Sequence, residues 1–155
     1  MKIKIEFQEP VFREKILHNL RNVKKLIPKL RQYPHEVLDD KFLIKNETFE
    51  VIAEFDFEIK NERIILFNNF KGSDLEDEVK KMLMFNLAED IGERCFVIDE
   101  ERRIKLFENF GEWFLLEKGK MYKLGRDKER LSEVELYHVP KWAKENREQA
   151  VGKLT

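Results

Sequence analysis

The fold is decided by a stretch near the middle of the chain, Phe49-Glu-Val-Ile-Ala-Glu-Phe-Asp-Phe-Glu-Ile-Lys60. Apolar and charged residues alternate along it, and a period of two is typical of an antiparallel strand with one buried and one solvated face. The face expected to be buried carries Phe49, Val51, Ala53, Phe55, Phe57 and Ile59. Polar breaks at residues 45–47 and 60–62 predict hairpin turns on both sides of this strand.

Further strands are expected on both sides of this stretch. Residues 2–7 alternate in the same way, with Ile3, Ile5 and Phe7 on one face. The segment 63–70 matches the segment 103–110 at six of eight positions, and we interpret both as parts of strand–turn–strand units in a meander. Candidate strands in the second half of the chain cover residues 94–99, 102–108, 112–117, 120–124 and 132–139.

Two amphipathic helices accompany the strands. Apolar residues three or four positions apart predict a helix over residues 11–27, which Pro28 ends. A similar pattern predicts a second helix over residues 73–91, which Gly92 ends. The pattern therefore predicts a single α+β domain over residues 1–155, an antiparallel meander packed against a basic N-terminal helix and a central helix, with residues 140–155 as a peripheral tail helix.

The composition narrows the class of protein. The chain has 155 residues, of which 42% are hydrophobic and 39% are charged, so that disorder is excluded. No run of 18 apolar residues predicts a membrane span, and the single Cys95 cannot form an internal disulfide. We expect a cytoplasmic protein, and the abundance of charge with only two Ser and two Thr fits a thermophile.

Several catalytic signatures are missing from the sequence. It contains no GxGxxG or GxxxxGK[ST] phosphate loop and no GxSxG elbow. His18, His35 and His138 are far apart and form no metal-binding motif. Cys95 lies in a predicted strand, where a free cysteine behaves as a small buried apolar residue. Serine-hydrolase and nucleotide-cradle chemistry therefore have no support in the sequence.

The charges are unevenly distributed along the chain. Residues 11–31 have a net charge of +6 and residues 118–130 of +4, whereas residues 32–117 have −11. A basic helix and a basic hairpin could together bind the phosphates of DNA or RNA, with Tyr122 stacking on a base. The candidate nucleic-acid-binding residues are Arg13, Arg21, Lys24, Lys25, Lys120, Tyr122, Lys123 and Arg126. Alternatively, these cations are neutralised by the acidic sheet face or bind an acidic protein partner without catalysis.

The acidic side of the central strand suggests a nuclease as a sharper form of this hypothesis. Asp56, Glu58 and Lys60 share one side of the strand, and carboxylates next to a lysine can hold a divalent metal and assist hydrolysis. The Glu58-Ile-Lys60 element resembles the E-x-K element of PD-(D/E)xK nucleases, with Asp40 in the place of their metal-binding aspartate. The resemblance implies Mg²⁺ or Mn²⁺ held by Asp40, Asp56 and Glu58, and catalysis by Asp56, Glu58 and Lys60.

A different class of function comes from the order of the predicted elements. A strand, a helix ending in Leu26-Ile-Pro-Lys-Leu30 and a long meander resemble the opening of helix-grip (START-like) domains. That resemblance implies a sheet wrapped around a C-terminal helix, with an apolar ligand enclosed by the Phe-rich strand face. The charge distribution places nucleic-acid association first, with an apolar-ligand carrier and a non-catalytic interaction module as alternatives.

Overall fold

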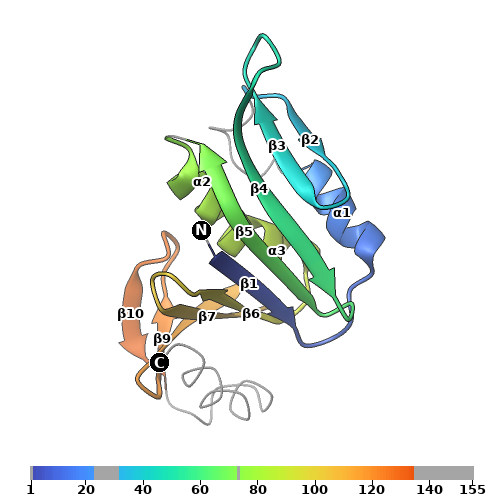
Figure 1. The fold of residues 1–155 in the computed structure, drawn as a ribbon. Coiled ribbons are helices and arrows are strands. Elements are labelled where there is room, and N and C mark those ends of the chain that lie inside the picture. Colours follow the sequence, from blue (N-terminus) through green and yellow to red (C-terminus); the bar gives the residue numbers. More distant parts are fainter. Residues whose placement is uncertain (1, 23–31, 73, 135–155) are drawn as a thin grey trace.

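The computed structural model describes residues 2–22, 32–72 and 74–134, and these residues form ten strands in one antiparallel sheet (Figure 1). The strand order across the sheet is β10-β9-β8-β7-β6-β1-β5-β4-β3-β2. The strands are β1 (Lys2–Phe7), β2 (His35–Val37), β3 (Lys41–Lys45), β4 (Val51–Lys60), β5 (Ile64–Gly72), β6 (Cys95–Asp99), β7 (Ile104–Asn109), β8 (Glu112–Glu117), β9 (Lys120–Leu124) and β10 (Arg130–Glu133).

The predicted meander is confirmed, but β1 divides it into two parts. Strands β2 to β5 follow one another on one side of β1, and β6 to β10 follow one another on the other side. β1 pairs with β5 and with β6, with Ile5 opposite Ile65 on one side and opposite Val97 on the other. The sheet is strongly twisted, so that β6 and β7 run across the direction of β3 to β5 (Figure 1).

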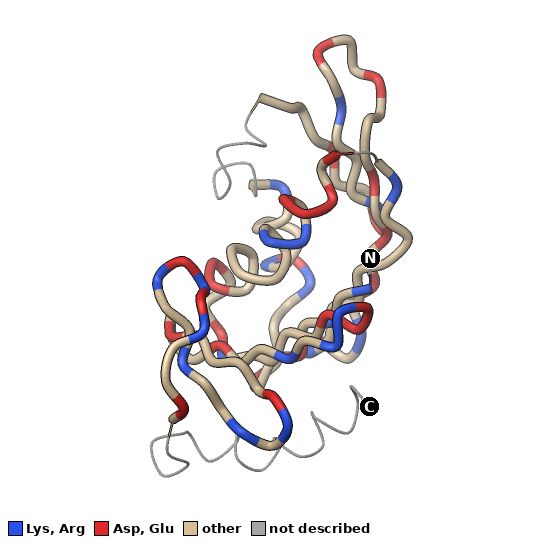
Figure 2. The backbone as a smooth tube through the Cα atoms, turned by 90° about the vertical axis from the view of Figure 1, so that its left-hand side faces the viewer, with Lys and Arg blue, Asp and Glu red and all other residues tan. Residues whose placement is uncertain are grey.

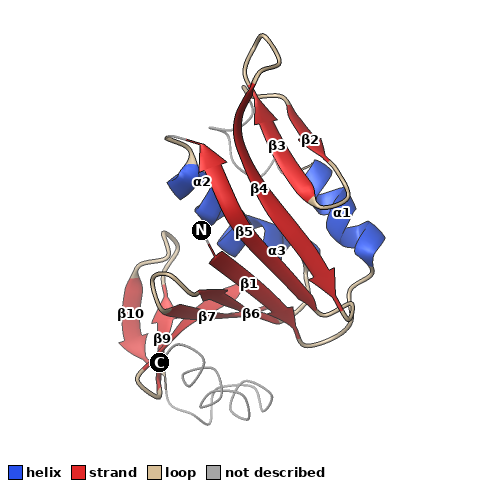
Figure 3. Ribbon diagram, in the orientation of Figure 1, coloured by secondary structure: helices blue, strands red, loops and turns tan. Residues whose placement is uncertain are grey.

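The helices lie on one face of the sheet (Figures 1 and 3). The first is α1 (Arg13–Arg21), and the part of its predicted range that falls in residues 23–31 lies outside the described residues. The second is a continuous helix made of α2 (Glu76–Lys81), a π-helical segment η3 (Met82–Leu87) and α3 (Ala88–Ile91). Gly92 ends it with φ 82°, as predicted.

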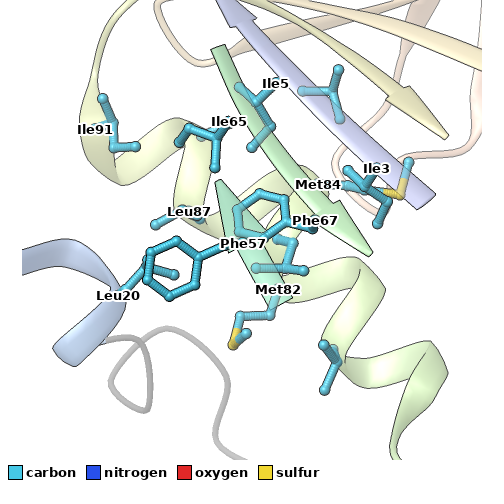
Figure 4. Close-up of a cluster of buried hydrophobic side chains, with 14 of the residues drawn as sticks. Ile3, Ile5, Leu20, Phe57, Ile65, Phe67, Met82, Met84, Leu87 and Ile91 are labelled. Carbon is cyan, nitrogen blue, oxygen red and sulfur yellow. The ribbon is translucent and has the colours of Figure 1, made fainter. Parts of the chain in front are cut away.

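The core lies between this helix, α1 and the inner face of the sheet. Figure 4 shows side chains of β1, β4 and β5 pointing toward those of the helices. Phe57 and Phe67 from the sheet are 3% and 0% exposed, and Leu20 and Leu87 from the helices are 0% exposed. Each such side chain contributes about 1.5–3 kcal/mol on burial, so this contact holds the helices on the sheet.

The predicted buried face of the central strand is correct from Ala53 onward and wrong at its start. Phe49 is 70% exposed and Val51 is 50% exposed. Phe49 lies in the β3–β4 turn with φ 62°, where Asn46 Oδ1 accepts backbone hydrogen bonds from Thr48 and Glu50. The strand begins only at Val51, beside a register shift in β3, so the alternation reaches the core at Ala53, four residues later than the sequence predicts.

The outer face of β6 to β9 is also buried, which a half-buried meander does not predict. All five residues of β6 are buried. A second apolar cluster on this face contains Phe96, Phe107, Phe114, Leu116 and Met121, with Val134 packed against it.

The C-terminal predictions are tested only in part. The last described strand, β10, ends at Glu133, within the predicted strand 132–139. Residues 135–139 of that prediction and the tail helix over 140–155 lie outside the described residues, as does the C-terminal helix that a helix-grip domain would place inside the sheet. No helix in the described part of the chain is long and apolar enough to cross a membrane.

Candidate ligand pocket and the predicted site residues

A pocket of about 380 Å³ lies between the central helix and the second half of the sheet. Its apolar lining comes from η3, β7, β8 and β9, and consists of Met84, Phe85, Ile104, Leu106, Leu115 and Leu124. Small-molecule sites are concave, mainly apolar and about 300–1,000 Å³ in volume, so this pocket is within the range of a small ligand.

Local structure explains why these side chains meet. On β7, Ile104 and Leu106 lie two residues apart and face the helix, and Leu106 pairs directly with Leu115 of β8. From the other side, Met84 and Phe85 come from the π-helical segment. π-helical turns are rare and are found frequently at functional sites, because the wider turn changes which side chains a helix presents.

The rim of the pocket is rich in cations. Among the described residues, the charged side chains that line it are Asp77, Lys80, Lys81, Arg102, Lys128 and Arg130. Lys80 is 5% exposed, and its Nζ lies 3.9 Å from Asp99, 3.6 Å from Glu101 and 3.9 Å from Glu76. This lysine therefore connects α2 to the β6–β7 turn.

The cations at the β9–β10 end of the rim are also held in place. Lys128 Nζ lies 3.1 Å from Glu89 and 5.4 Å from the centre of the Phe85 ring. Arg130 donates a hydrogen bond of 3.1 Å to Glu117, and its guanidinium lies 3.7 Å from the centre of the Tyr122 ring. These contacts keep positive charge beside the apolar lining.

The residues predicted for nuclease chemistry lie elsewhere, on β4. Asp56 is directly opposite Lys41 of β3, and Lys41 donates a hydrogen bond of 2.6 Å to it. Asn69, in the left-handed region with φ 54° beside a register shift, donates a second bond of 2.9 Å. These bonds, first from Lys41 and then from Asn69, lower the pKa of Asp56.

The other residues of this predicted site lie close to Asp56, on β4 or next to it. Glu58 Oε1 lies 3.9 Å from Lys60 Nζ, and the Asp40 carbonyl accepts a hydrogen bond of 3.0 Å from the Phe57 amide. In the described part of the chain, no group of three or more His, Cys, Asp or Glu side chains is placed to hold a metal ion. Metal binding by Asp40, Asp56 and Glu58 stays a prediction.

A second pocket borders Asp56 on the outer side of the β4–β5 hairpin. Its volume is about 410 Å³, and it is lined by Lys41, Asp56, Asn69, Phe70 and Lys71. Lys41 and Asn69 already bond to Asp56, and Lys71 lies 4.0 Å from Glu54, which does not line the pocket.

The predicted basic residues are not brought into one patch by the described residues. Arg13 and Arg21 lie on α1, which contacts β2 at one edge of the sheet, whereas Lys120 and Lys123 lie on β9 near the opposite edge. Lys24 and Lys25 are outside the described residues. Figure 2 shows blue and red positions interspersed over helices and hairpins rather than one continuous basic face.

The β8–β10 hairpins nevertheless carry exposed cations. Lys120, Lys123 and Arg126 are exposed and form no ion pair with any residue that the structure describes. Tyr122 is half-buried, with the Arg130 guanidinium over its ring. One face of the predicted stacking residue is therefore already covered.

The cysteine prediction is confirmed, and a buried acid lies beside it. Cys95 is 0% exposed, and burial followed by the charge of Glu108 raises the pKa of its thiol. Glu108, opposite Cys95 in the ladder, is 1% exposed and accepts a hydrogen bond of 2.7 Å from the Gly111 amide. Burial raises the pKa of Glu108, although this bond lowers it, and the nearby charges of Glu89 and Glu93 raise it further.

Comparison of the chain with protein-family models, curated proteins and solved structures finds no match. Any function of the candidate pocket must therefore be inferred from the geometry of the pocket itself. Sequence reasoning missed its residues because the helical stripe and the strand alternation assign them to an ordinary core. The basic pairs Lys80-Lys81 and Arg102-Arg103, each next to apolar residues, were the available signal. Only the fold brings Lys80, Lys81 and Arg102 to one rim.

Proposed function

We propose that this protein binds a small ligand with an apolar body in the pocket between the central helix and strands β7 to β9. This is the apolar-ligand alternative of the sequence analysis, placed at a different helix from the one the helix-grip resemblance implies. The observation that supports this proposal most directly is the pocket of about 380 Å³. Its apolar lining comes from the helix on one side and from the sheet on the other.

Two physical arguments favour a ligand-binding pocket over a packing defect without function. Filling an apolar pocket with apolar atoms gains about 25 cal/mol for each Å² of apolar surface removed from water. A π-helical segment gives up regular α-helical geometry where it borders the pocket, and such segments concentrate at functional sites.

The test uses N-phenyl-1-naphthylamine, a neutral apolar dye whose fluorescence rises in apolar sites. We expect saturable binding to the wild-type protein and a loss of about tenfold in affinity for Leu115→Trp, which fills the pocket. Leu43→Trp is the matched control, because Leu43 is a half-buried strand leucine away from the pocket lining. Absence of saturable binding, or equal loss in both variants with unchanged circular dichroism, would refute the proposal.

Nucleic-acid association is the second candidate, on the strength of the exposed cations of the β8–β10 hairpins. Lys120, Lys123 and Arg126 could release counterions from a phosphate backbone, and binding would then weaken steeply with salt. Fluorescence anisotropy with labelled DNA and RNA at 50 and 200 mM salt tests this, with Lys120→Gln/Lys123→Gln as the variant. Binding that is insensitive to salt and to this variant would count against it.

The nuclease form of this candidate is tested in the same assay. Addition of Mg²⁺ or Mn²⁺ should produce cleavage that disappears in Glu58→Ala if Asp40, Asp56, Glu58 and Lys60 act as predicted. Glu50→Ala is the control, because Glu50 is an exposed residue of the neighbouring turn. Intact probes after incubation of the wild-type protein with either metal would remove this form of the candidate.

A further inference from the structure

The charged rim shows which kind of apolar ligand the pocket would take. The cations that line it differ in how fully they are engaged by acidic side chains and aromatic rings. Lys80 is buried beside carboxylates, Lys128 is held by Glu89 and lies over Phe85, and Arg130 is held by Glu117 and lies over Tyr122. These contacts serve the fold and leave little capacity for a ligand.

Two cations at the α2 end of the pocket are different. Lys81 lines the pocket, is exposed, and forms no ion pair with any residue in the described ranges. Arg102 contacts Asp77 through Nη2 at 3.1 Å and Asp99 through Nε at 3.8 Å, and neither contact uses Nη1. A lysine ammonium and a guanidinium edge therefore lie at one end of the apolar lining.

The acid one helical turn before Lys81 is already paired with Arg102. Asp77 lies one helical turn before Lys81, a spacing at which the two could pair, but its carboxylate is bonded to Arg102 instead. Of the lining cations at this end of the pocket, Lys80 is paired with Glu76, Asp99 and Glu101, and Arg102 with Asp77 and Asp99. Lys81 is the lining cation with which no carboxylate of the described residues pairs. An anion would be attracted there, whereas a cationic head group would be repelled.

We infer that the ligand is an amphipathic carboxylic acid, with its apolar chain along Met84, Leu106 and Leu115 and its carboxylate at Lys81 and Arg102. This inference rests on the proposed function, because it names the chemical class of ligand for the same pocket. It also gives the orientation of the ligand in the pocket: its charged end lies beside α2, and its apolar end lies toward Leu124 and β9.

The test compares decanoic acid with 1-decanol, which have the same chain length and differ in the head group. Each is titrated against bound N-phenyl-1-naphthylamine at pH 7.5, where the acid is ionised. We expect the acid to displace the dye at a concentration about fivefold lower than the alcohol. If neither compound nor the dye binds, the proposed function fails; if both compounds bind equally, only the carboxylate inference fails.

Variants then locate the head group. Lys81→Gln should reduce the preference for the acid to near unity and leave the affinity for 1-decanol unchanged. Asp77→Asn should act in the opposite direction and increase the preference. Lys123→Gln is the matched control for lost charge, because Lys123 is an exposed lysine of β9 that does not line the pocket.

Because the substituted residues are exposed, we expect all three variants to fold normally, and circular dichroism checks this. An acid preference that persists in Lys81→Gln, or that falls equally in Lys123→Gln, would contradict the proposed position of the carboxylate. A preference that decreases in Asp77→Asn would contradict it as well.

Discussion

Glu108 is a residue whose environment opposes its charge. Its side chain on β7 is almost completely buried. One of its carboxylate oxygens accepts a hydrogen bond from the Gly111 amide, and the other has no hydrogen-bond partner among the described residues. Burial raises its pKa above the usual value of 4.5, so the folded state holds this proton at pH values where the unfolded chain releases it. The free energy of unfolding therefore decreases as the pH rises from about 4.5 through the pKa of the folded state.

Replacing this carboxyl by an amide should remove that pH dependence. We expect Glu108→Gln to be more stable than the wild type at neutral pH, by about 1 kcal/mol, and the difference to shrink toward pH 4. Urea unfolding across this pH range measures it, with Glu112→Gln, an exposed glutamate on β8, as the control. Parallel stability curves for the wild type and Glu108→Gln would contradict this account of Glu108.

At the scale of elements, the central helix is fastened to the sheet by charge as well as by apolar contact. Lys80 of α2 and Asp99 of β6 are 5% and 0% exposed, and their charged atoms lie 3.9 Å apart. Removing one member of a buried pair leaves the other charge without compensation, which is costly in an environment with little water. Arg102 Nε, 3.8 Å from Asp99, would compensate in part.

We predict that Lys80→Met lowers the free energy of unfolding by about 3 kcal/mol. Adding Asp99→Asn should recover a large part of this loss, because the uncompensated charge is then removed. Lys2→Met is the control: Lys2 pairs with Glu100 at the surface, where ion pairs contribute about 0–1 kcal/mol. Urea unfolding of the single and double variants decides, and a double variant no more stable than Lys80→Met would be inconsistent with this explanation.

The β4–β5 pairing depends on a glycine that allows close approach. Gly72 has φ 150° and pairs with Ala53, and a Cβ atom at Gly72 would lie 2.7 Å from the Ala53 Cβ. We expect Gly72→Ala to destabilise the protein by about 2 kcal/mol, because the ladder must shift to relieve this contact.

A double-mutant cycle separates this contact from a general effect of alanine. The losses in Gly72→Ala and Ala53→Gly should be less than additive in the double variant, because Ala53→Gly removes the colliding methyl group. Thermal and urea unfolding of the four proteins give the coupling energy. Additivity within about 0.5 kcal/mol would show that the close approach is not the cause.

At the scale of the whole molecule, the sequence predicts the elements better than their arrangement. The alternation of Ile3, Ile5 and Phe7 and the stripe from Leu75 to Leu87 correctly indicate which faces are buried, because a buried face needs a regular period. Nothing local indicates that β1 lies between β5 and β6, since the residues with which it pairs are 58 or more positions away in the sequence.

The candidate site was beyond sequence reasoning for a related reason. Met84, Leu106 and Leu115 have the periodicity of ordinary core residues, and only the packed helix and sheet leave space between them. The π-helical turn that presents Phe85 has no pattern that the periodicity of 3.6 residues could reveal. Charge runs such as residues 118–130 stand out in a sequence whatever their partners in space, which is why they dominated the functional hypothesis.

The proposed function requires that the pocket between the central helix and β7 to β9 holds a ligand. Methyl chemical-shift mapping during titration with decanoic acid tests it most directly. We expect saturable shifts of the methyl signals of Met84, Ile104, Leu106, Leu115 and Leu124, and unchanged signals for Ile44 and Ile59 in the far half of the sheet. Shifts absent from these pocket methyl groups at saturation, or centred on the far half of the sheet, would contradict it.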